Sequence, residues 1–292
     1  MTGRLGLRGA AALSALTLAI AACSSAEGRL EQANELRHQG KPREALAAYR
    51  DLLGDLGDGT VPKWETEVRL KALKYAADLS YLELGDFAGA ISYYRRIVTL
   101  YPGSDEAFRA RAAIGDIYVA RFQDRQAAIA QYSAVAQSTS KEAPKYQLEV
   151  VRQYLELKNY EQARTEARIL RERWPESAET DEGQLLTAQS WALEGRTDEA
   201  LGAFQAAWER HPRPEIAALA LEGAGHIQAQ AGHFDKAIEL YTQAMKSHPN
   251  PEALRTSIEK VRERREAAKT VTPGDRAAVF DHKVRGRTQE VQ

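Results

Sequence analysis

A pattern of eight residues recurs six times between residues 45 and 244, and it constrains the fold more than any other feature of this sequence. An alanine is followed four residues later by an aromatic residue, or by Ala167 in the fourth copy, and three residues after that by an apolar residue. Spacings of four and three put three side chains on one face of an α-helix. The copies are Ala45/Tyr49/Leu52, Ala90/Tyr94/Ile97, Ala128/Tyr132/Val135, Ala163/Ala167/Leu170, Ala200/Phe204/Ala207 and Ala237/Tyr241/Ala244. The sequence therefore predicts six helices that all use the same face.

The intervals between copies leave room for one more helix before each of them. The alanines at 45, 90, 128, 163, 200 and 237 are 45, 38, 35, 37 and 37 residues apart. Each preceding segment is expected to place a small or short residue at a fixed point, with a second marker three residues later: Ala33/Leu36, Asp78/Tyr81, Gly115/Tyr118, Val151/Tyr154, Ala188/Trp191 and Gly225/Gln228. Gly40, Gly85, Gly195 and Gly232 then supply left-handed turns. The third and fourth copies lack this glycine, and the third has one extra residue between its helices.

Helix–turn–helix units near this length, with Ala-x3-aromatic and a late proline, resemble the tetratricopeptide repeat family over residues 27–250. Late prolines occur at Pro102, Pro175, Pro212 and Pro249. The resemblance implies an all-α fold, a right-handed α-solenoid of about six helix pairs within residues 23–250. In such a stack each pair leaves an apolar face that only its neighbour covers.

Three segments lie outside the regular period. Gly54–Thr60 is rich in turn residues and is expected to project between the first two repeats. Residues 251–269 predict a C-terminal capping helix, with Leu254, Ile258 and Val261 on one side. Residues 270–292 contain Pro-Gly and scattered charges, which predicts a flexible, modestly basic tail. The tail is either solvated or in contact with an acidic partner or lipid headgroups.

The N-terminus has the pattern of a targeting segment. Residues 1–22 carry Arg4 and Arg8 and then an apolar run that is too short for a membrane span. The run ends in Ile20-Ala21-Ala22-Cys23, which resembles the lipobox of bacterial lipoproteins and contains the single cysteine of the chain. The resemblance implies cleavage after residue 22, acylation of Cys23 and, with Ser24 following, the periplasmic face of the outer membrane. An ordinary signal peptide with an incidental cysteine, or an uncleaved anchor, are the alternatives.

Motifs for catalysis, cofactors and metals are missing from the sequence. There is no Gly-rich phosphate loop, no H-E-x-x-H and no cysteine pair. His226 and His233 are close enough along the chain to approach one another, but a pair without a third ligand does not predict a metal site. The net charge of −1 gives no sign of a nucleic-acid partner. We therefore expect neither an enzyme nor a cofactor-binding or nucleic-acid-binding protein.

The family register instead predicts a partner groove lined by the first helix of each pair. The inward-facing candidates are Asn34, Arg37, Tyr75, Leu79, Leu82, Arg109, Asp116, Lys145, Arg152, Glu156, Gln189, His226 and Gln230. Basic residues in consecutive repeats suit an extended or helical segment of acidic character. The alternative is that these residues are only the solvated face of a curved stack. Some family members clamp a peptide's terminal carboxylate with set Lys, Arg and Asn positions, an arrangement that is not reproduced here.

Taken together, these features predict a membrane-anchored scaffold for protein–protein interactions in a bacterial envelope complex. The chain resembles periplasmic tetratricopeptide lipoproteins, among them the D-type lipoprotein of outer-membrane β-barrel assembly, a Tol–Pal cell-division coordinator and the pilotins of type IV pilus secretins. Breaks such as Tyr101-Pro102-Gly103-Ser104 contribute to this likeness. The implied role is assembly of a barrel or secretin. The alternative is a regulatory subunit that recruits a periplasmic enzyme such as a cell-wall hydrolase.

Overall fold

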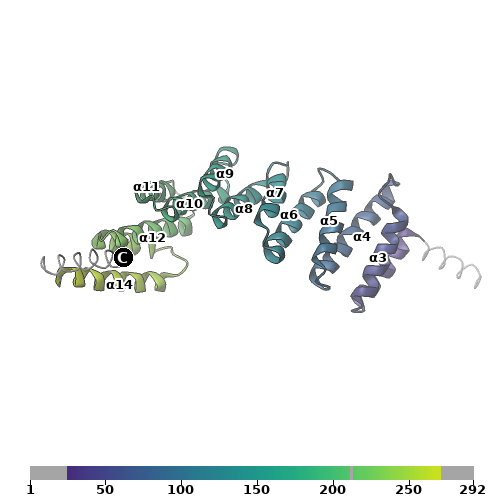
Figure 1. Ribbon diagram of the computed structural model, residues 1–292, viewed down its shortest axis with the longest axis horizontal. Helices are drawn as coiled ribbons and strands as arrows, with labels where there is room; N and C mark the ends of the chain where they lie inside the picture. Colours follow the sequence, from purple (N-terminus) through teal and green to yellow (C-terminus); the bar gives the residue numbers. More distant parts are fainter. Residues whose placement is uncertain (1–24, 211–212, 271–292) are drawn as a thin grey trace, which may run out of the picture. The chain divides into compact units, whose positions relative to one another are not determined.

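The computed structural model describes residues 25–210 and 213–270, which form thirteen α-helices and no strand (Figure 1). Six successive pairs are α2 (Ala26–His38) with α3 (Pro42–Leu56), α4 (Lys63–Leu82) with α5 (Phe87–Leu100), α6 (Asp105–Ile117) with α7 (Arg125–Ala136), α8 (Ala143–Glu156) with α9 (Tyr160–Arg173), α10 (Ala178–Leu193) with α11 (Thr197–Glu209), and α12 (Pro214–Gln230) with α13 (Phe234–Ala244). A short π-helix, η1 (Tyr118–Phe122), continues α6, and α14 (Pro251–Thr270) follows the last pair. The predicted all-α solenoid of helix pairs is confirmed. The hand of its superhelix stays a prediction.

The chain divides after Tyr146 into two compact units. In the first unit, helices α2 to α6 share one continuous core. In the second unit, one core joins α10, α11 and α12, and another joins α12, α13 and α14. Leu254, Ile258 and Val261 of α14 are buried in the latter, so α14 covers the apolar face that the sixth pair leaves open. Pro212, Cys23, the segment 1–22 and most of the predicted tail lie outside the described residues.

The repeated pattern forms the inner face of each second helix. All six leading alanines are at most 1% exposed, and the five aromatic residues are at most 7% exposed. In two pairs the ring lies directly against a glycine of the first helix. A Cβ atom on Gly115 would lie 2.4 Å from Cε1 of Tyr132, and one on Gly225 would lie 2.6 Å from Cε1 of Tyr241. Glycine is therefore required there because the ring occupies the space of a side chain.

In the fourth pair the larger of the two packed residues lies on the first helix and the smaller one on the second. Its small position holds Val151 instead of glycine or alanine, and its aromatic position holds Ala167. Both side chains belong to one buried cluster with Ala163. The larger residue has moved from the second helix to the first, so the interior stays filled without a ring.

Every pair turns through one residue of positive φ, whether or not that residue is glycine. Gly40, Gly85, Gly195 and Gly232 have φ between 66° and 84°, while Gln123 and Lys158 take 54° and 57° in the third and fourth pairs. This left-handed residue lets the following N–H group reach back to a carbonyl near the end of the first helix. The absence of glycine from these two repeats thus changes the residue in the turn but leaves its backbone conformation the same.

The lengths of these turns correct the predicted register of the second repeat. In four pairs the closing hydrogen bond spans five residues, for example from the N–H of Lys41 to the carbonyl of Leu36. In the second and third pairs it spans six, from Asp86 to Ser80 and from Asp124 to Tyr118. Both pairs therefore contain an extra residue, and the small position of the second repeat is Ala77, not Asp78.

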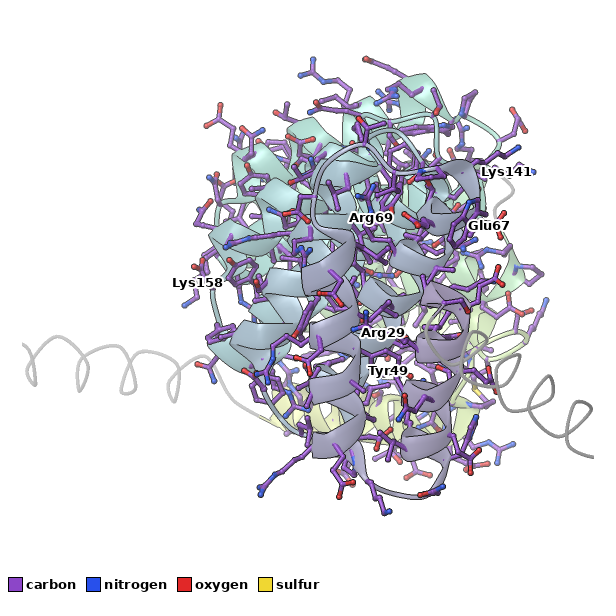
Figure 2. The ribbon with its side chains drawn as sticks, turned by 90° about the vertical axis from the view of Figure 1, so that its right-hand side faces the viewer. Arg29, Tyr49, Glu67, Arg69, Lys141 and Lys158 are labelled. Atoms are coloured by element: carbon purple, nitrogen blue, oxygen red, sulfur yellow. The ribbon has the colours of Figure 1, made fainter. Side chains whose placement is uncertain are left out.

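The predicted turn-rich segment begins later than expected, because α3 runs to Leu56, and the residues that follow are bound by two arginines of the first unit. Arg69 of α4, labelled in Figure 2, faces this segment. It is 5% exposed. It donates to the carbonyl oxygens of Gly57 and Gly59 at 3.2 and 2.7 Å and to the hydroxyl of Tyr101 at 3.0 Å. Arg96 pairs with Asp58 at 2.6 Å. A buried guanidinium group needs such acceptors, and satisfying it fixes the loop.

The close contact between first and second helices gives a direct test. We expect Gly225→Ala to lower the free energy of unfolding by about 1–3 kcal/mol, because the added methyl group overpacks the contact with Tyr241. Gly202→Ala in α11 is the matched control, since a Cβ atom there meets nothing within 4 Å. It should stabilise the helix by about 0.5–1 kcal/mol. Urea unfolding followed by circular dichroism measures both, and equal stability of the two variants would contradict the packing.

Candidate functional site

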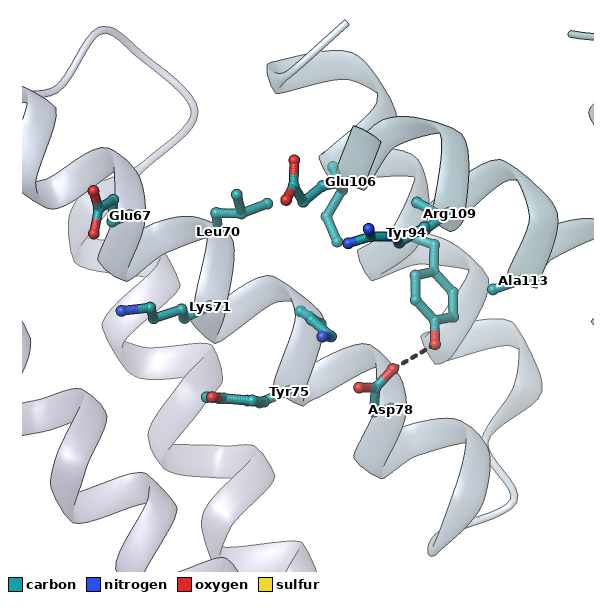
Figure 3. A pocket seen from close by; sticks show the side chains of 12 residues that line it. Glu67, Leu70, Lys71, Tyr75, Asp78, Tyr94, Glu106, Arg109 and Ala113 are labelled. Atoms are coloured by element: carbon teal, nitrogen blue, oxygen red, sulfur yellow. Dashed lines mark hydrogen bonds between the residues drawn. The ribbon is translucent and has the colours of Figure 1, made fainter. Parts of the chain in front are cut away.

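A groove in the first unit is lined by the first helices α4 and α6 and floored by the second helix α5 (Figure 3). It encloses a cavity of about 520 Å³. Its lining residues are Glu67, Leu70, Lys71, Lys74, Tyr75 and Asp78 of α4, Tyr94 and Ile97 of α5, and Glu106, Arg109, Ala110 and Ala113 of α6. Successive members on each helix are one or three residues apart, so a helical period of 3.6 directs them to one side.

The floor of this groove is fixed by a hydrogen bond from Tyr94 to Asp78. The phenolic hydroxyl donates to Oδ1 of the carboxylate at 2.7 Å (Figure 3). Burial, and then the bond to Asp78, raise the pKa of Tyr94 above its usual value, so the hydroxyl stays protonated. The carboxylate of Asp78 therefore stabilises the position of the Tyr94 ring in the floor of the groove.

The same bond recurs in the other two pairs of the first unit. Tyr49 donates to Oδ1 of Asn34 at 2.7 Å, and Tyr132 donates to Oδ1 of Asp116 at 2.7 Å. In each case the acceptor follows directly after the small residue of the first helix. The second unit does not follow this pattern: the residues directly after its three small positions are Arg152, Gln189 and His226.

Charged side chains of both signs remain available in the groove of the first unit. Lys71, Lys74 and Arg109 form no ion pair within the described part of the chain, and neither do Glu67 and Glu106. Figure 3 shows Arg109 extending from α6 into the space beside α4.

Apolar surface lies between these charges. Leu70, Tyr75 and Ile97 provide it, and the Tyr75 ring also carries the guanidinium group of Arg37 at 5.2 Å. Such a surface suits a polypeptide segment with charged and apolar side chains better than a small uncharged molecule.

The second unit has its own groove, of different chemistry. A cavity of about 620 Å³ lies between α10, α11 and α12, and no Asp, Glu, Lys or Arg lines it. Phe204, Leu193 and Ile227 give it apolar walls, and Gln189 and Gln230 add neutral polar groups. The ring of His226 meets that of Tyr241 edge-on at 5.4 Å between centroids. This groove is suited to uncharged, largely apolar side chains.

The structure brings together only part of the predicted groove. Tyr75 and Arg109 line the first cavity, and Gln189, His226 and Gln230 line the second. Asn34 and Arg37 of α2 and Asp116 of α6 line neither cavity and instead contact Tyr49, Tyr75 and Tyr132, respectively. Lys145 lies over the ring of Tyr146 at 5.1 Å, Arg152 is paired with Glu149 and Glu182, and Glu156 is exposed.

Leu79 and Leu82 show the effect of the shifted register. Leu79 is 1% exposed and belongs to the core, so its assignment to the groove was wrong. Leu82 is 73% exposed at the end of α4 and lines neither cavity.

The true groove position in this repeat is Asp78, and the sequence analysis also missed Lys71 and Lys74. In the other pairs with a glycine turn, the small residue lies seven positions before the glycine. Counting seven positions back from Gly85 gives Asp78, whereas the extra residue in this turn makes Ala77 the small residue. The only signal of the error was that Ala, not Asp, is the expected small residue.

Within residues 25–210 and 213–270 no three His, Cys, Asp or Glu side chains come close enough to hold a metal ion. The ring of His233 contacts Gln228, and Nδ1 of His226 lies 3.0 Å from the carbonyl of Glu222. Over the same residues, no helix combines the length and the apolar character needed to cross a bilayer.

Known protein families match the chain over the same repeats. Family models described as tetratricopeptide repeat match residues 30–105, 75–145 and 151–221, and a second such model matches residues 192–258. No curated protein sequence matches the chain.

Among solved structures, the apo form of RapI is similar with a TM-score of 0.55 and 12% identity, over 83% of this chain and 72% of that one. The peptide-binding protein YrrB gives 0.47 and 17%, over 73% and 98%. The type IV pilus biogenesis factor PilW gives 0.46 and 18%, over 80% and 98%. The likeness to RapI shows the fold alone.

The buried tyrosines predict how stability depends on alkaline pH. Burial raises the pKa of Tyr49 from its usual 10.0 to about 12. Because the folded value is higher than the unfolded one, the contribution of this residue is complete below pH 10 and is lost as the pH rises towards 12. Thermal unfolding between pH 8 and 11.5 should therefore show a smaller loss of stability for Tyr49→Phe than for the wild type. Parallel curves for the two proteins would contradict this assignment.

Proposed function

Since this chain belongs to the tetratricopeptide repeat family, we propose that it is a lipid-anchored scaffold that holds a partner protein in a bacterial envelope complex. The proposal combines an anchor at Cys23 with the charged groove between α4 and α6. Proteins of this family act as interaction scaffolds. The anchor and the envelope partner are our additions.

The observation that carries the proposal is the position of the only cysteine. It follows Ile20-Ala21-Ala22, directly after a basic and then apolar leader. Acylation there would place at least two chains on one residue, and two membrane signals give stable anchoring where one gives only marginal binding. The acylated residue would then lie at the membrane surface, two positions before Ser25, the N-cap of α2.

The groove of the first unit supplies the interaction surface. Its unpaired Lys71, Lys74 and Arg109 favour carboxylates on the partner, and Glu67 and Glu106 favour basic residues one helical turn away. Pairing charges across an interface fixes register and excludes partners of the wrong pattern. Tyr75 and Ile97 supply the apolar contact area.

Within the envelope we assign the scaffold to outer-membrane assembly, of a β-barrel or a secretin. Ser24 after the cysteine favours the outer membrane in many Gram-negative bacteria, by resemblance to lipoprotein sorting signals. The second candidate is a targeting subunit for a soluble periplasmic enzyme. The two differ in whether the partner depends on the anchor.

Affinity capture from crosslinked cells tests both halves of the proposal. The tagged wild type, Cys23→Ala and the groove variant Lys71→Glu/Arg109→Glu would be compared. Lys41→Glu/Arg43→Glu, at the N-terminal end of α3, is the control of equal charge change. We expect the wild type and the control to retain one outer-membrane barrel or secretin, and both other variants to lose it.

The contrary outcomes are distinct. Capture that survives Cys23→Ala but not the groove change, with a soluble enzyme as partner, replaces assembly by recruitment. Capture that is unaffected by the groove change contradicts the groove. A Cys23→Ala protein that stays in the membrane and incorporates fatty acid contradicts lipidation at that residue.

A further inference from the structure

The second unit contains a smaller cavity, whose lining residues differ from those of the groove in this unit. It measures about 220 Å³ and lies between α9, α10 and α11. It is lined by Arg164, Ala167, Arg168, Arg171, Gln184, Thr187, Ala203 and Ala206. Three of these residues are cationic and none is acidic, so the lining has a clear excess of positive charge.

The three arginines form one stripe along α9. Their spacings of four and three residues put them on the same helix face. Arg164 is held in place, because it pairs with Glu194 at 3.0 Å, donates to Oγ of Ser190 at 3.2 Å and lies 3.5 Å from the centre of the Trp191 ring. Arg168 and Arg171 are exposed and have no ion-pair partner among the described residues.

Gln184 adds a hydrogen-bond donor that the protein leaves unused. Its amide nitrogen Nε2 is buried and finds no acceptor among the described residues. Buried donors of this kind are uncommon and call for an explanation, such as an ion that binds there. The hydroxyl of Thr187 is already committed to the carbonyl of Gly183 at 2.9 Å.

The small side chains around the cavity explain why the space exists. Ala167 stands where five other repeats carry an aromatic ring, and Ala203 and Ala206 present only methyl groups from α11. These three alanines supply no charge and little volume, whereas the arginine side chains and Gln184 supply donors. The site therefore combines empty space with several hydrogen-bond donors, and no carboxylate is among its lining residues.

We propose that this cavity binds an oxyanion of the phosphate class. Two free guanidinium groups offer paired N–H donors in the planar fork that matches phosphate oxygens, and the Gln184 amide offers one more. That number of donors exceeds what the two oxygens of one carboxylate accept, which favours phosphate. The anion is either free phosphate or the phosphomonoester of a lipid headgroup. This site is independent of the groove in the first unit and of the proposed anchor.

The test measures thermal stability and titration calorimetry of the full-length chain with inorganic phosphate, at ionic strength held constant with chloride. We expect phosphate to stabilise the wild type and to bind at least tenfold more weakly to Arg168→Gln/Arg171→Gln. Lys260→Gln/Arg262→Gln on α14 removes the same charge from an exposed face and should bind like the wild type. Equal binding by all three proteins would overturn the proposal, because it would show only a general effect of net charge.

Gln184→Met provides a second variant that does not depend on charge. Removing an unpaired buried donor should raise the melting temperature without phosphate and reduce the further increase that phosphate produces. An undiminished response to phosphate would show that the amide does not face the anion.

Vesicles separate the two sources of the anion. Binding of the wild type, and not of the double arginine variant, to vesicles containing phosphatidic acid in phosphatidylcholine identifies a lipid headgroup. Binding of inorganic phosphate without vesicle binding identifies the free ion. Binding of neither would overturn the proposal.

Discussion

Five of the six second helices carry an aromatic ring at the repeated position. The contact between that ring and a small residue of the first helix is the interaction on which this fold depends. At Gly115 and Gly225 the ring occupies the space of a Cβ atom, so the two helices approach as closely as their backbones allow. In the first unit the ring's hydroxyl then bonds to the next residue of the first helix, Asn34, Asp78 or Asp116. One side chain thus sets both the distance and the rotation of the pair, and a short helix that is marginal alone gains its stability from this packing.

The same interaction decides what the groove can offer a partner. Because Asp78 accepts the hydrogen bond of the Tyr94 hydroxyl, it stabilises the floor of the groove, and the recognition of a partner depends on Lys71, Lys74, Arg109, Glu67 and Glu106. In the second unit Phe204 has no hydroxyl, the neighbouring residue is the neutral Gln189, and the cavity there has no charged lining. The fourth pair lacks the ring altogether, and Ala167 instead borders the cavity with the arginine stripe. The three surfaces thus differ in chemistry as well as in the residue at the aromatic position of the repeat.

The repeated Ala-x3-aromatic pattern was sufficient to predict the helix pairs, because it reports the buried face directly. It was insufficient where the backbone departs from the ideal period. The extra residue in the second pair shifted the predicted small position from Ala77 to Asp78, placed Leu79 in the groove and hid Lys71 and Lys74. Nor did the sequence show that Arg69 binds the carbonyls of the Gly57–Gly59 segment, because that contact joins backbone atoms whose positions depend on the fold. Left-handed Gln123 and Lys158 likewise follow from the turn and not from residue preference.

A double-mutant cycle on Tyr94 and Asp78 is the most direct test of this central interaction. Tyr94→Phe, Asp78→Ala and the combined variant would be compared by urea unfolding, with Phe204→Leu and Gln189→Ala as the cycle at a pair that has no hydroxyl bond. The account predicts a coupling energy of about 0.5–3 kcal/mol for the first cycle, the range for residues in direct contact, and a smaller value for the second. Equal coupling in the two cycles would contradict the claim that the tyrosine hydroxyl and its acceptor fix the pair.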